Sequence, residues 1–65
     1  MCEADAYLLH EDGKEELYLA EVDVIEPCPG GQLRLISVYG EQKFLAGRIK
    51  NMSLLQHKVF LEVIS

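Results

Sequence analysis

Turn-forming residues divide this chain into short segments, and their spacing is the feature that most constrains its fold. Asp12-Gly13 carries a strong hairpin signal, and further turns or loops are expected at residues 26–31, 39–41 and 54–57. Asp-Gly pairs favour two-residue hairpin turns, because glycine accepts the positive φ angles that these turns require. No segment shows the 3.6-residue apolar period of a globular helix. The sequence therefore predicts an all-β fold.

The segments between the turns are predicted to form six or seven short strands. We expect these strands at residues 4–10, 15–19, 22–24, 32–38, 42–46, 48–53 and 58–64. Residues 20–21 are expected to form a bend, and Gly47 a kink or bulge. Residues 26–31 are expected to form a loop, because two prolines in this segment remove backbone donors. Short strands at this spacing are typical of a small antiparallel barrel.

The length of 65 residues indicates one small domain, residues 1–65. A chain of this size buries only about 60% of its unfolded surface. Its two cysteines cannot form a dense disulfide framework, so we expect a homodimer that completes the core. Six acidic residues among the first 20 exclude a secretion signal, and no apolar run approaches the roughly 20 residues that span a bilayer. We therefore expect a cytoplasmic protein without membrane contact.

The Met1-Cys2 start indicates a metal site. An initiator methionine is normally removed before a small residue, which would leave Cys2 with a free amine beside its thiol. Their ordinary pKa values of about 8 and 8.5 allow a metal to deprotonate both near neutrality. The amide nitrogen of Glu3 offers a possible third donor. Nitrogen donors in a tetragonal set favour nickel(II) or copper(II), and two copies of Cys2 at a twofold axis would supply four donors.

Besides Cys2, five residues are weaker candidates for this site. Glu3 and Asp5 flank the proposed ligand and are predicted to orient its amine or to balance charge. Cys28 has no Cys-x-x-Cys spacing and is interpreted first as an ordinary loop thiol. His10 and His57 are each interpreted first as polar edge residues, with His10 the better candidate for a ligand.

Five short segments give the chain a resemblance to the CooT family. They are Met1-Cys2-Glu3-Ala4, Asp12-Gly13-Lys14, Gly40-Glu41-Gln42, Gly47-Arg48-Ile49-Lys50 and His57-Lys58. The Met-Cys start and the Gly47-Arg48-Ile49 segment are the most specific parts. The resemblance implies a small β-barrel homodimer that binds nickel through Cys2 and serves nickel insertion into carbon monoxide dehydrogenase. It thereby implies a nickel enzyme, or the maturation factors of one, as partner.

Two other function classes remain open. The net charge of −5 and six scattered basic residues argue against nucleic-acid binding, which rests on Lys and Arg at phosphates. An RNA-binding barrel would have to use Arg34, Arg48 or Lys50, and Arg48 is expected instead in an internal ion pair. A protein-docking adaptor, with Cys2 incidental, is the other alternative. No catalytic arrangement is recognisable, so we do not expect an enzyme.

Overall fold

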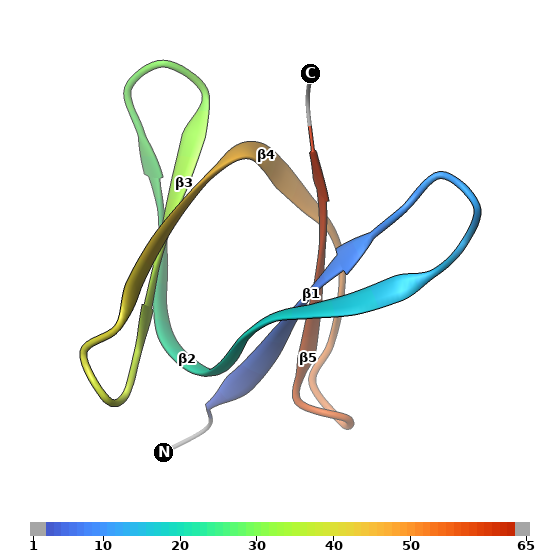
Figure 1. Ribbon diagram of the computed structural model, residues 1–65. Helices are drawn as coiled ribbons and strands as arrows, with labels where there is room; N and C mark the ends of the chain where they lie inside the picture. The colour runs from blue at the N-terminus through green and yellow to red at the C-terminus, as the bar shows by residue number, and fades with distance from the viewer. Residues whose placement is uncertain (1–2, 64–65) are drawn as a thin grey trace.

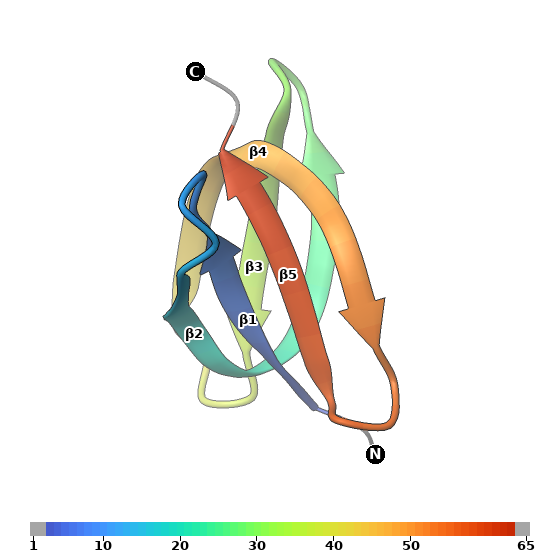
Figure 2. The same ribbon diagram turned by 90° about the vertical axis from the view of Figure 1, so that its right-hand side faces the viewer.

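Five β-strands close into a barrel in the computed structural model, which describes residues 3–63 (Figures 1 and 2). They are β1 (Ala4–Leu9), β2 (Glu15–Cys28), β3 (Gln32–Ser37), β4 (Gln42–Ser53) and β5 (Lys58–Val63). Strands adjacent in sequence pair antiparallel, whereas β1 and β5 pair in parallel and close the ring. The all-β prediction is confirmed, but the expectation of a wholly antiparallel barrel is wrong at this closing pair.

The strand count is five, and not six or seven, because β2 and β4 are long. They span 14 and 12 residues. β2 pairs with β1 as far as Val22 and with β3 from Val22 onward, with a register shift between Val22 and Val24. Such an irregularity lets a strand bend without ending. The break predicted at residues 20–21 is therefore a bend inside one continuous strand.

The predicted loop at residues 26–31 is shorter than expected. β2 continues through Pro27, which lies opposite Leu33 of β3, and ends at Cys28. Because β1 leaves β2 at Val22, this part of β2 lies at an edge with β3 on one side. Proline is tolerated on an edge strand, where its missing N–H need not break a ladder bond.

Gly47 lies where β4 changes partners. β4 pairs with β3 up to Ala46 and with β5 from Gly47 onward. A Cβ at Gly47 would press against the carbonyl oxygen of Glu62, so close packing of the two backbones accounts for the glycine. The register irregularity lies between Ile49 and Asn51, so the bulge predicted at Gly47 is displaced along the strand.

The core is formed by small and aliphatic side chains from all five strands. Its buried members are Ala6, Leu19, Val22, Leu33, Leu35, Leu45, Val59 and Leu61. Side chains also join β2 to β4, which are not neighbours in the strand order. The hydroxyl of Tyr18 donates to the carbonyl of Phe44 (3.0 Å), and Nζ of Lys43 donates to the carbonyl of Tyr18 (2.8 Å). These bonds join β2 and β4, between which no backbone ladder runs. Between Glu3 and Val63 no helix has the length and apolarity to cross a membrane.

Candidate metal centre at the amino-terminal end of the barrel

Cys2, the main predicted ligand, lies outside the described residues. The position from which it extends is defined by Glu3 and by the first residues of β1. The structural question is therefore how the start of β1 is held and what surrounds it.

Asp5 holds the start of β1 through two hydrogen bonds. Its amide donates to the carbonyl of His57 (2.8 Å), and its Oδ1 accepts the amide of Glu21 (3.0 Å). Glu21 and His57 are also the two non-glycine residues with positive φ, 53° and 56°, in the described part of the chain. A left-handed conformation costs an L-residue about 1–2 kcal/mol. Both strained residues thus bind Asp5, three positions after Cys2, and one oxygen of the Asp5 carboxylate is engaged by backbone.

The surroundings of Glu3 carry negative charge. The carboxylate of Glu21 raises the pKa of the Tyr39 phenol above its ordinary value, and the charge of Glu3 adds to this effect. Glu3, Glu21 and Tyr39 therefore lie close enough to interact, although they come from the start of β1, the bend of β2 and the β3–β4 turn. The negative charges of Glu3 and Glu21 favour a cation nearby, whereas the positive charge of Lys58, opposite Asp5 on β5, opposes one.

A small cavity of about 220 Å³ adjoins Glu3. It is lined by Glu3, Ala4, Met52, Ser53, Leu54, His57, Lys58 and Val59. The parallel pairing of β1 with β5 brings the β4–β5 turn beside the start of β1, as Figure 2 shows. Sequence reasoning did not place His57 or Met52 near Glu3, because only this long-range pairing brings them there.

The weaker candidates lie away from the start of β1. His10 follows the other end of β1, six residues or roughly 20 Å along the strand from Ala4. Its Nε2 pairs with Oε1 of Glu16 at 2.8 Å. Cys28 is a half-buried free thiol at the end of β2, and Figure 1 shows the β2–β3 turn at the opposite end of the barrel from the start of β1. Within one chain, neither residue is brought together with Glu3.

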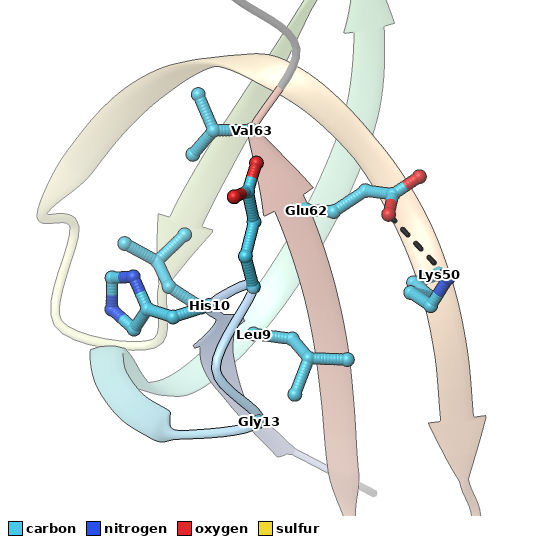
Figure 3. Close-up of a pocket in the computed structure, with 8 residues that line it drawn as sticks. Leu9, His10, Gly13, Lys50, Glu62 and Val63 are labelled. Atoms are coloured by element: carbon cyan, nitrogen blue, oxygen red, sulfur yellow. Dashed lines mark ion pairs between the residues drawn. The ribbon is translucent and has the colours of Figure 1, made fainter.

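A larger cavity of about 510 Å³ lies where the parallel strands β1 and β5 separate (Figure 3). Its lining includes His10, Lys50, Glu62 and Val63. Arg48 and Lys50 both pair with the carboxylate of Glu62, and Arg48 holds the pKa of that carboxyl below its ordinary value. No group of three or more His, Cys, Asp or Glu side chains suited to a metal occurs within residues 3–63. The described side chains around this cavity therefore include no group of that kind.

The ion pair predicted for Arg48 is present, but it is not internal. Arg48 pairs with Glu62, the residue opposite it on β5, and its side chain is 70% exposed. The pair lies on the outside of the barrel because successive residues of a strand face opposite sides, and Gly47, just before Arg48, faces inward.

Comparisons with known proteins identify the family. The family model described as CO dehydrogenase accessory protein CooT matches residues 1–62. The chain belongs to the CooT family. A crystal structure of a protein assigned as CooT from Carboxydothermus hydrogenoformans is 38% identical in sequence, with a TM-score of 0.89. The match covers 98% of this chain and 100% of that one. No match to a curated protein was found.

Proposed function

We propose that this protein carries nickel(II) for the maturation of a nickel enzyme, with carbon monoxide dehydrogenase as the client. The observation that carries the proposal is the family match over residues 1–62, which includes the Met1-Cys2 start. The family description names an accessory role rather than a catalytic one, and we propose that the chain is not an enzyme. We place this role in the cytoplasm, where the client would be assembled.

The proposed ligands are the amine and thiolate of Cys2, and the amide nitrogen of Glu3 is the alternative donor if it loses its proton. Two subunits would share one nickel ion and supply its four donors from two copies of Cys2. Two features of the described chain support this arrangement. Asp5 fixes the start of β1, and the charges of Glu3 and Glu21 favour a cation nearby.

The test is a nickel titration of protein from which Met1 has been removed. We expect one nickel per two chains by native mass spectrometry, with thiolate-to-metal charge-transfer absorption. Because both donors must lose protons, affinity should rise between about pH 6 and pH 9. Cys2→Ala should abolish binding, whereas Cys28→Ala is the matched control and should bind as the wild type does. Full affinity in Cys2→Ala would refute the ligand assignment.

The nucleic-acid alternative gains no support from the three basic residues that it would have to use. Arg34 pairs with Glu26, while Arg48 and Lys50 share Glu62, so each has a carboxylate partner within the chain. Phosphate binding would have to displace these partners. An affinity for RNA that falls steeply with salt would revive this alternative.

A further inference from the structure

Two aromatic side chains point outward from neighbouring strands of the barrel. Successive residues of a strand face opposite sides, and the residues before and after Tyr7 and Phe60 face the core, so both rings lie on the outside. Tyr7 and Phe60 are partners in the parallel ladder of β1 and β5, which run side by side in Figure 2, and their ring centroids are 6.0 Å apart. On β2, Leu17 lies opposite Tyr7 and is 52% exposed. We call Tyr7, Leu17 and Phe60 the aromatic surface.

The aromatic surface does not contribute to the core. The buried core of residues 3–63 contains no aromatic side chain, and neither ring is among the partly buried residues that pack against it. Aromatic residues are enriched at the centres of protein interfaces, and apolar side chains exposed side by side mark such interfaces. The aromatic surface therefore has the composition of a site that a partner covers.

A lysine borders the aromatic surface at the start of β5. Lys58 stands two residues before Phe60, so the two side chains face the same side of the sheet. Its Nζ lies 5.2 Å from the centroid of the Tyr7 ring. Asp5 is opposite Lys58 in the ladder, and its Oδ1 accepts the amide of Glu21. The ammonium group of Lys58 is therefore held at the edge of the rings.

Two more basic side chains border the aromatic surface on β4. Arg48 and Lys50 share the carboxylate of Glu62, which stands two residues after Phe60 on the same face. Lys50 lies 3.5 Å from this carboxylate, and its side chain is 52% exposed. We call Arg48, Lys50 and Lys58 the basic border.

The charge of the basic border indicates which partner fits. It holds three of the six basic residues, against the two carboxylates of Asp5 and Glu62, in a chain of net charge −5. An acidic segment of another protein is attracted to a border of this sign. A twofold contact centred on the border would instead bring the cations of two copies together. Charge therefore favours a different, acidic partner over a second copy.

We propose that the aromatic surface is the docking site of a partner protein that presents an acidic segment to the basic border and an apolar side chain to the rings. In the proposed nickel role this partner is the client enzyme, so its identity rests on that role. Tyr7 lies three residues after Ala4, or roughly 10 Å along β1. A client docked here would stand near the end of the barrel from which Cys2 extends.

The test compares two substitutions that change the chain in the same way. Phe60→Glu and Phe44→Glu each replace an outward aromatic ring with a carboxylate. Phe44 is 54% exposed and lies opposite Arg34 on β3, outside the ladder of β1 and β5. Leu17→Glu is a second probe of the aromatic surface and decides the test if Phe60→Glu does not fold. Circular dichroism checks the fold of each variant.

Binding is measured by biolayer interferometry against carbon monoxide dehydrogenase purified without nickel, at low and at high salt. Phe60→Glu should weaken binding at least about 30-fold, the factor for a hot-spot residue, and Phe44→Glu less than about 3-fold. Lys50→Glu should slow association at low salt and reduce the salt dependence. Lys14→Glu makes the same change in the β1–β2 turn and should do neither.

Three results would overturn the docking site. The first is a wild-type protein that does not bind the enzyme, and the second is an equal effect of Phe60→Glu and Phe44→Glu. The third is a different occupant. In that case Phe60→Glu would leave enzyme binding unchanged but abolish self-association in sedimentation equilibrium, or binding to a single-stranded uridine oligonucleotide.

The docking site and the nickel role fail in different ways. If the wild type binds the enzyme through Phe60 but binds no nickel, the docking site is supported and the nickel role is refuted. If the wild type binds nickel through Cys2 and Phe60→Glu binds the enzyme as the wild type does, the nickel role is supported and the docking site is refuted.

Discussion

Replacing Gly47 with alanine tests whether the close contact between the backbones of β4 and β5 requires a glycine at this position. An alanine Cβ would press against the carbonyl oxygen of Glu62 and stand 3.2 Å from its carbonyl carbon. It would also stand 3.4 Å from Cδ2 of Leu45. The backbone of Gly47 lies outside the left-handed region, so alanine can adopt its conformation. The substitution is therefore a steric test of the contact between β4 and β5.

The expected cost follows from two opposing effects. Overpacking a filled interior costs about 1–3 kcal/mol, and a contact with main chain, which moves less freely than a side chain, belongs near the upper end. The lower entropy of the unfolded alanine chain offsets about 0.4–1 kcal/mol. We expect a net loss of about 2 kcal/mol in the free energy of unfolding. For a domain of this size the loss corresponds to a Tm lower by roughly 8–16 °C.

Urea unfolding measures this loss, with both proteins at one fixed concentration because any association between chains makes stability depend on concentration. Ala46→Ser is the matched control, since it also adds one heavy atom at the neighbouring, exposed position of β4. This control should change stability by no more than about 0.5 kcal/mol. If Gly47→Ala is as stable as Ala46→Ser, the contact with Glu62 does not account for the glycine.

Two further predictions concern titrating groups. Because Arg48 lowers the pKa of Glu62 below 4.5, the pair stabilises the fold above that pH, and this contribution is lost as the pH falls through the lower folded pKa. Glu62→Gln should therefore flatten the acid side of a curve of stability against pH, and an unchanged curve would contradict the role of the pair. Because the carboxylate of Glu21 raises the pKa of Tyr39 above 10.0, Glu21→Gln should lower it in a titration of tyrosinate absorbance. A Tyr39 pKa that does not move would show that Glu21 is not the cause.

The turns could be predicted from the sequence because each depends on a local signal. Gly13, Gly30, Gly31 and Gly40 all have positive φ in the structure, and they lie in the turns expected from their positions. Glycine marks such sites because it has no Cβ to clash. Glu21 and His57 adopt the same region without being glycine, and nothing local marks them. Their conformations depend on hydrogen bonds with Asp5 of β1 and Val38 of the β3–β4 turn, which are distant in the sequence.

The strand count was harder to predict because a strand's continuity depends on its neighbours. Pro27 appeared to end a strand, yet β2 passes through it because that part of β2 lies at an edge. The candidate metal site also depends in part on strand pairing that the sequence does not show. The Met1-Cys2 start and the nearby acidic residues are visible in the sequence, whereas the cavity formed with Met52 and His57 exists only because β1 and β5 pair.

The pairing of β1 with β5 also has a consequence for the order of folding. Asp5 is opposite Lys58, and Ala6 is opposite Val59, so the closing ladder joins the first and last strands of the described chain. Such distant contacts form late, since the entropy of closing the whole intervening loop must first be overcome. On the ribosome, β1 emerges before β5 and cannot form this ladder until β5 has been synthesised. The amide of Asp5 can donate to the carbonyl of His57 only after residue 57 has been synthesised, so a shorter nascent chain would lack this support beside the proposed nickel site.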